Sequence, residues 1–172
     1  RRLLLSRGSD LTAEQAALMA EREAKGETVA IVALNGQTIG LIGITDPIKP
    51  DAFGLVQALK RSGIKTTVML TGDNPRAAQQ VADELGIDEV RAGLLPGQKV
   101  EAIRELQLAG HVVAMVGDGI NDAPALATAD VSIAMGSSGT RVAMEAADIA
   151  LMGDRIGQVP VAIGISRRIL GV

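Results

Sequence analysis

Along most of the chain, short apolar runs of strand length alternate with longer segments whose apolar residues recur every three or four positions. The short runs predict strands at residues 64–70, near Val90, and at 111–116, 131–134 and 148–151. The longer segments predict helices at 51–61, 75–85, 97–109, around 140–147 and at 156–170. Such alternation predicts an α/β fold, a Rossmann-like parallel sheet with helices on both faces.

The first 44 residues follow a different pattern. Thr12 and Gln15 have the spacing of a capping box, which predicts the start of a helix. Apolar segments at 28–34 and 38–44 then flank Asn35-Gly36, the dipeptide that favours a two-residue hairpin turn. We therefore expect a small annex, made of one helix and one β-hairpin, ahead of the parallel sheet.

The strongest candidate chemistry follows the predicted strand at 111–116, in the sequence Gly117-Asp-Gly-Ile-Asn-Asp122. In open α/β sheets ligands bind at the carboxyl ends of strands, which is where Asp118 and Asp122 would lie. Their hard oxygen donors suit Mg²⁺, and the glycines leave room for a phosphate. An ordinary strand-to-helix turn with polar caps is the alternative, but it explains neither glycine.

A second turn of the same design follows the strand predicted at 64–70. Its sequence is Thr71-Gly72-Asp73-Asn74-Pro75, in which Asn74 is a good N-cap and Pro75 suits the first helical position. The backbone N–H groups at such a helix start favour an anion, and Thr71 adds a hydroxyl. Taken alone, the pentapeptide also fits an ordinary capped helix.

Lys99 is the third candidate, because it lies just after Pro96 at the start of the helix predicted over 97–109. A cation near a helix N-terminus is unfavourable unless an anion lies there as well. Lys99 is therefore interpreted as a phosphate ligand, with an exposed lysine on a solvated surface as the alternative.

Together these motifs resemble, in order and spacing, the phosphorylation domain of P-type ATPases, ion pumps of the haloacid dehalogenase superfamily. The resemblance covers about residues 44 to 172. Three further segments are most similar to the heavy-metal-transporting branch: 46–50, 133–136 and 145–152. Within the last of these, residues 147–152 favour zinc or cadmium over copper as the transported ion.

The resemblance implies ATP hydrolysis through an aspartyl-phosphate intermediate, with Mg²⁺ and ATP as cofactors. Phosphoryl transfer depends mainly on positioning and charge neutralisation. The implied catalytic residues are Thr71 and Lys99, the implied phosphate ligands also include Gly72, Asp73 and Asn121, and the implied Mg²⁺ ligands are Asp118 and Asp122.

One catalytic element of that family is not found here. Its nucleophile lies in the motif Asp-Lys-Thr-Gly-Thr, and no aspartate of this chain is followed by lysine. In the family the nucleophile's strand lies between the strands that end here at Leu70 and Val116, so sheet edges at Val68 and Val113 are expected to be exposed. The resemblance thus implies a fragment that is inactive alone. Residues 1–44 would be the tail of a nucleotide-binding domain, and residues 45–172 would be most of the phosphorylation domain. A proline hinge at 46–50 would join the two.

Composition bears on partners. The net charge is −3, the basic residues are dispersed and Phe53 is the only aromatic residue, which argues against nucleic-acid binding. There is no cysteine, and no apolar run approaches the ~20 residues of a membrane span. The resemblance therefore places the heavy-metal cation in membrane helices outside this chain, and the chain itself in a cytoplasmic domain of an integral membrane protein.

Two other functions fit some of the same residues. A soluble phosphatase of the same superfamily would share Asp118 and Lys99, although the hairpin annex counts against it. A non-catalytic phosphate- or nucleotide-binding module would lack the nucleophile. His111, predicted to begin a strand without a ligand partner, and the scattered methionines are interpreted as structural.

Overall fold

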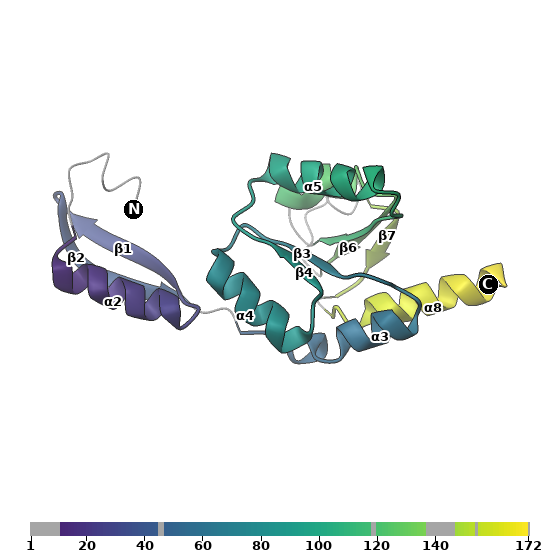
Figure 1. Ribbon diagram of the computed structural model, residues 1–172, viewed down its shortest axis with the longest axis horizontal. Helices are drawn as coiled ribbons and strands as arrows, with labels where there is room; N and C mark the ends of the chain where they lie inside the picture. Colours follow the sequence, from purple (N-terminus) through teal and green to yellow (C-terminus); the bar gives the residue numbers. More distant parts are fainter. Residues whose placement is uncertain (1–10, 45–46, 118–119, 137–146, 154, 172) are drawn as a thin grey trace.

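The computed structural model describes residues 11–44, 47–117, 120–136, 147–153 and 155–171 (Figure 1). Its first part is the predicted annex, in which helix α2 (Ala13–Ala24) packs on a hairpin of β1 (Thr28–Leu34) and β2 (Gln37–Ile44). The capping box is present, because the Thr12 hydroxyl accepts from the Gln15 N–H at 3.2 Å. At the turn, Asn35 has a φ of 50° and Gly36 a φ of 82°, as the hairpin prediction requires.

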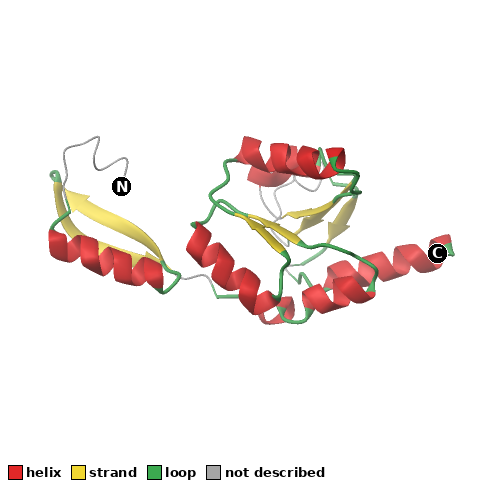
Figure 2. Cartoon of the chain, viewed as in Figure 1, coloured by secondary structure: helices red, strands yellow, loops and turns green. Residues whose placement is uncertain are grey.

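The second part alternates strands and helices, and its helices lie on both faces of the strands (Figure 2). This confirms the predicted α/β class. The elements are α3 (Leu55–Arg61), β3 (Val68–Leu70), α4 (Pro75–Leu85), β4 (Glu89–Arg91), α5 (Pro96–Leu108), β5 (Ala114–Gly117), α6 (Ala123–Leu126), β6 (Val131–Met135), β7 (Ile149–Leu151) and α8 (Gln158–Leu170).

The parallel strands form two sheets. Strand β3 pairs with β4, and β5 pairs with β6, which in turn pairs with β7. Within the described residues β3 and β5 are not hydrogen-bonded to each other, so each has one edge outside any ladder. These are the edges predicted at Val68 and Val113; the two side chains themselves are half-buried, and Val113 packs against the apolar cluster that contains Met115.

Several elements are shorter than the apolar pattern predicts. The predicted strands at 64–70 and 111–116 begin only at Val68 and Ala114, where their ladders with β4 and β6 begin. His111 therefore lies before β5 and is exposed, so the prediction that it begins a strand is wrong. Part of the hinge and the helix predicted around 140–147 lie outside the described residues.

The helix predicted at 51–61 is interrupted. It is a 3₁₀ turn, η1 (Pro50–Ala52), followed by α3. Between them Phe53 is extended and Gly54 has a φ of 80°, a conformation that favours glycine. The apolar periodicity continues across this break, which is why the pattern predicts one helix.

Two apolar clusters fix the strands that carry the candidate site. The first joins α5, β5 and α6 through Ile103, Met115 and Leu126. The second joins β6 to α8 through Ile133, Met135 and Val159. Met115 and Met135 are buried in these clusters, which confirms for both of them the prediction of core packing, whereas Met152 is 76% exposed, so the prediction is wrong for that residue.

The amino ends of the parallel strands share one hydrogen-bonding device. In each case an aspartate lies immediately before a strand, and its carboxylate accepts a backbone N–H from the neighbouring strand. The donor is the residue just before the first pair of the ladder between the two strands, so the hydrogen bond satisfies an N–H group that the ladder does not use. The three cases are Asp88 with Thr67 at 2.9 Å, Asp130 with Val113 at 2.8 Å and Asp148 with Ser132 at 2.8 Å. We call these residues the aspartate staples.

The staples also favour the charged form of each aspartate. A hydrogen bond from Lys60, with further bonds from Thr67, lowers the pKa of Asp88 to about 2. The pKa of Asp130 is lowered mainly by the Val113 N–H, and the pKa of Asp148 mainly by the Ser132 hydroxyl. The hydrogen bonds at the amino ends of the parallel strands thus favour ionised carboxylates.

Candidate functional site

After β5 the chain turns so that Asp122 lies close to Gly117, the last residue of the strand. Strand β5 ends at Gly117, and Asp122 closes the short 3₁₀ turn η2 (Ile120–Asp122) before α6. A Cβ atom on Gly117 would lie 3.0 Å from Cβ and 3.2 Å from Oδ2 of Asp122. Any larger residue at position 117 would therefore require Asp122 to move by a few tenths of an ångström. Asp118, the other predicted Mg²⁺ ligand, lies outside the described residues.

Lys99 meets Asp122 directly. The Lys99 Nζ atom donates to Asp122 Oδ1 at 2.7 Å, and the two side chains are only 16% and 15% exposed. Lys99 lies in the first turn of α5, where the Gln98 side chain accepts the Leu95 N–H at 2.9 Å. The anion that offsets a cation at this helix start is therefore, in this structure, the Asp122 carboxylate.

The turn after β3 is held by the hydroxyl of Thr71. Thr71 Oγ1 donates to Asp73 Oδ2 at 2.8 Å and accepts the Asp73 N–H at 3.1 Å. Asn74 Oδ1 accepts the Ala77 N–H at 2.9 Å, which confirms that Asn74 is the N-cap of α4. The residues predicted to bind phosphate thus form an ordered polar turn at the carboxyl end of β3.

A second loop, which the sequence motifs do not indicate, supports this turn. After β4, the Leu94 N–H donates to the Thr71 carbonyl at 3.0 Å and the Gly93 N–H donates to the Asp73 carbonyl at 2.8 Å. Gly93 has a φ of 69°, and a glycine just after a predicted strand was the available signal. The next residues begin α5, so this loop joins the Thr71 turn to the helix that carries Lys99.

Of the predicted site residues, two are in direct contact, and the others lie in neighbouring loops. Lys99 and Asp122 are in contact, whereas Thr71, Gly72 and Asp73 lie in the adjoining turn. Asn121 is exposed within η2. The set combines a cation, a hydroxyl and a carboxylate at the carboxyl ends of parallel strands, which suits a phosphoryl group.

The donor set also fits a magnesium ion, in part. Asp122 offers carboxylate oxygens, the ligand type that Mg²⁺ prefers, and only its Oδ1 atom is bonded to Lys99. Among the described residues, no three acidic, histidine or cysteine side chains are grouped so that they could hold a metal ion by themselves. Magnesium commonly keeps several waters and binds one or two carboxylates together with substrate phosphates, so such a group is not required.

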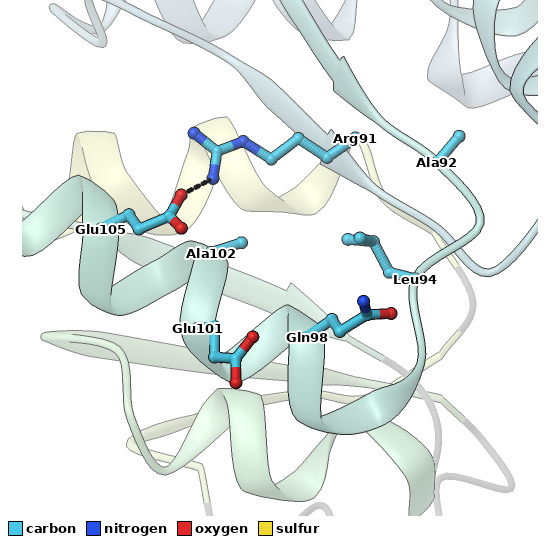
Figure 3. Close-up of a pocket in the computed structure, with 7 residues that line it drawn as sticks. All are labelled: Arg91, Ala92, Leu94, Gln98, Glu101, Ala102 and Glu105. Carbon is cyan, nitrogen blue, oxygen red and sulfur yellow. Dashed lines mark hydrogen bonds and ion pairs between the residues drawn. The ribbon is translucent and has the colours of Figure 1, made fainter.

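A surface pocket lies elsewhere among the described residues. It has a volume of about 300 Å³ and is lined, between β4 and α5, by Arg91, Ala92, Leu94, Gln98, Glu101, Ala102 and Glu105 (Figure 3). Its one cation, Arg91, donates to Glu89 at 2.7 Å and to Glu105 at 2.6 Å, and these bonds raise the pKa of Arg91. An anion would have to compete with two carboxylates, so the pocket does not suit a phosphate.

Residues 3–130 match the family model of the haloacid dehalogenase-like hydrolases, and the chain belongs to that family. Its relatives are heavy-metal P-type ATPases. The chain is 55% identical over 130 residues to a manganese-exporting P-type ATPase of Mycobacterium tuberculosis and 52% identical over 130 residues to a zinc-exporting P-type ATPase of Mycobacterium marinum. It is 51% identical over 148 residues to the copper-transporting ATPase RAN1 of Arabidopsis thaliana.

These alignments cover most of this chain but little of each relative. They span 76% of the chain and 18% of the two mycobacterial proteins, and 86% of the chain and 15% of the plant protein. Within the described helices, none is long and apolar enough to cross a membrane.

Solved structures agree with the relatives. A zinc-transporting PIB-type ATPase in its E2.Pi state superposes with a TM-score of 0.75 at 43% identity, covering 93% of this chain and 26% of that one. The catalytic domain of the CPx-ATPase CopB-B superposes with a TM-score of 0.62 at 36% identity, covering 77% of this chain and 52% of that one. The chain is thus homologous to the catalytic domains of heavy-metal P-type ATPases.

Proposed function

We propose that this chain supplies part of the cytoplasmic catalytic machinery of a heavy-metal cation-transporting P-type ATPase. Residues 1–44 are the tail of its nucleotide-binding domain, and 45–172 are its phosphorylation domain without the nucleophile strand. The observation that carries the proposal is the contact of Lys99 with Asp122 at the carboxyl end of β5, beside the Thr71 turn. The identity to transporters over most of the chain supports it.

In this mechanism the residues of the chain hold and neutralise the phosphoryl group. Lys99 provides a positive charge, while Thr71 and the N–H groups of its turn orient the phosphoryl oxygens. Asp122, with Asp118, would hold Mg²⁺, which supplies charge neutralisation at the transferred phosphate. The half-buried position of Lys99 limits solvent around its charge and strengthens that interaction.

The nucleophilic aspartate comes from Asp-Lys-Thr-Gly-Thr, a motif this sequence does not contain. Its strand would lie between β3 and β5, and each of these strands has one edge that pairs with no described strand, which is consistent with that position. The chain alone therefore hydrolyses no ATP. Its partners are ATP and, through membrane helices of the complete protein, a heavy-metal cation. Neither a soluble phosphatase nor a binding module accounts equally well for the annex.

Variants of the complete pump test the proposal. Asp118→Asn removes a Mg²⁺ ligand charge but keeps the side-chain shape, and Lys99→Ala removes the neutralising cation. We expect each to lower phosphoenzyme formation from ATP by about a hundredfold or more, the usual cost of losing one electrostatic contact to the transition state. The measurement is incorporation of labelled γ-phosphate into protein.

Lys60→Ala is the matched control, because Lys60 also forms a short ion pair, with Asp88 at 2.6 Å, but at the opposite edge of the fold. We expect it to retain phosphoenzyme formation. Wild-type labelling in Lys99→Ala or Asp118→Asn would show that the site has been assigned to the wrong residues.

A further inference from the structure

The carboxylate of Asp122 has a single partner among the described residues. Lys99 Nζ donates to its Oδ1 atom at 2.7 Å. Asp122 is also the N-cap residue of α6, but its side chain accepts no backbone N–H group of that helix. In this respect it differs from the aspartate staples, whose carboxylates each accept a backbone N–H group. The Asp122 carboxylate is therefore held by one flexible side chain rather than by the backbone.

The Lys99–Asp122 pair is also the least exposed ion pair of the described residues. Its side chains are 16% and 15% exposed, whereas at least one partner in each other pair is 43% exposed or more. Charges at so covered a site are screened weakly by water and salt. A second cation at Asp122 would therefore be repelled by the Lys99 ammonium.

A magnesium ion that takes Asp122 as a ligand would come close to this ammonium. Mg²⁺ binds carboxylate oxygens at about 2.1 Å. Asp122 offers one negative charge, and Lys99 already neutralises it. Both oxygens belong to the same carboxylate, so an ion on Oδ2 would also lie near the ammonium on Oδ1. The lysine and the metal ion are thus alternative partners of Asp122.

A released Lys99 would remain near the proposed phosphoryl site. It lies in the first turn of α5, which begins directly after the loop of Gly93 and Leu94. That loop donates two hydrogen bonds to the Thr71 turn, from the Gly93 N–H at 2.8 Å and from the Leu94 N–H at 3.0 Å. The backbone therefore holds Lys99 close to the turn that is proposed to orient the phosphoryl oxygens. A phosphoryl group there gives the ammonium another anion.

We propose that Lys99 and Mg²⁺ compete for Asp122, and that metal binding releases the lysine toward the phosphoryl group. The inference rests on the proposed function, because it takes Asp122 as a Mg²⁺ ligand and Lys99 as a phosphoryl ligand. It has a reciprocal consequence. Binding of Mg²⁺ frees the lysine for the phosphoryl group, and binding of the phosphoryl group frees the carboxylate for Mg²⁺, so each ligand raises the affinity for the other.

Magnesium binding to the whole 172-residue chain tests the competition. Isothermal titration calorimetry with Mg²⁺ alone compares the unaltered chain with Lys99→Met at equal ionic strength. We expect Lys99→Met to bind Mg²⁺ about tenfold more tightly, because no ammonium has to be displaced. The gain should disappear when Asp122→Asn is added. Lys60→Met is the matched control, because it breaks a 2.6 Å ion pair at the opposite edge of the fold, and it should not change the Mg²⁺ affinity.

A second measurement needs no substitution and covers the case in which circular dichroism shows that Lys99→Met is unfolded. In a chain with ¹⁵N-labelled lysine, Mg²⁺ should shift the NMR signal of the Lys99 ammonium and leave that of Lys60 in place. An unchanged Lys99 signal while Mg²⁺ binds would overturn the inference. Equal Mg²⁺ affinity with and without Lys99, lost in Asp122→Asn, would also overturn it but leave the proposed function standing. No Mg²⁺ binding by folded Lys99→Met at millimolar metal would overturn both the inference and the assignment of Asp122 to Mg²⁺.

Discussion

Among single residues, the contact of Lys99 with Asp122 determines the chemistry of the candidate site. It joins the start of α5 to the end of β5, across 23 positions of sequence. From the sequence motifs, Lys99 is predicted to bind phosphate and Asp122 to bind Mg²⁺; neither role predicts that the two side chains bind each other. In the structure the two groups form an ion pair with each other, which keeps two half-buried charges paired.

The pairing has a measurable effect on stability. Lys99→Met leaves the Asp122 carboxylate half-buried without its cation, so we expect a loss of about 2 kcal/mol in the free energy of unfolding by urea. The double variant with Asp122→Asn should lose about 1 kcal/mol less than the sum of the single variants. Lys25→Met, which breaks only the exposed pair with Glu21, should cost less than about 0.5 kcal/mol. Strict additivity at Lys99 and Asp122 would contradict the pairing.

Gly117 offers a second test at the same site. Gly117→Ala places a methyl group 3.0 Å from Asp122 Cβ, so we expect a loss of about 1–3 kcal/mol and displacement of η2. Gly164→Ala is the control, because nothing lies within 4 Å of its Cβ position inside α8. It should stabilise the fold by about 0.5–1 kcal/mol. Equal thermal unfolding of both variants would show that Gly117 has no special role.

At the level of elements, the aspartate staples divide the fold into two functional edges. Carboxylates at the amino ends of the strands accept backbone N–H groups, whereas polar residues at the carboxyl ends remain available for ligands. This arrangement was not predicted, because aspartate is also common in ordinary turns before strands, where it need not contact a neighbouring strand. Only the register of the ladders shows that Asp88, Asp130 and Asp148 play the same part.

The staples make stability depend on pH in the acid range. Each pKa is lower in the folded chain than in the unfolded one, so the stabilisation is complete above the unfolded value and is lost as the pH falls through the folded value. For Asp88 that window extends from about pH 4 down to about 2. Between these pH values, the urea concentration at the unfolding midpoint should therefore fall less in Asp88→Ala than in the unaltered chain. In Asp83→Ala, a change on the exposed side of α4, the midpoint should fall as much as in the unaltered chain. The same slope in both variants would contradict this role.

Elements were predicted best where local signals agree. The Thr12 capping box, the Asn35 turn and the Asn74 cap each depend on neighbouring residues, and all are present. Strand limits depend on distant partners, so the strands predicted at 64–70 and 111–116 are too long. The contact of Lys99 with Asp122 and the support of the Thr71 turn by Gly93 are also long-range, and the linear spacing of the motifs does not reveal them.

For the whole molecule, the proposed function requires the motif Asp-Lys-Thr-Gly-Thr, which this sequence does not contain, and the strand that would carry it. Strands β3 and β5 form no ladder with each other within the described residues, and both candidate loops lie at the carboxyl ends of these strands. An added parallel strand between them would place its own carboxyl end beside Thr71 and Lys99. Unpaired edges of this kind also favour association with other strands.

The most direct test supplies that strand in trans. The chain is mixed with Mg²⁺ and labelled ATP, alone and with a separately produced segment of its parent that carries Asp-Lys-Thr-Gly-Thr and the rest of the nucleotide-binding domain. We expect acid-stable, hydroxylamine-sensitive label only in the mixture, on the added segment, and we expect Lys99→Ala to abolish it while Lys60→Ala does not. Label on this chain alone would mean that a nucleophile exists within these 172 residues and would contradict the account.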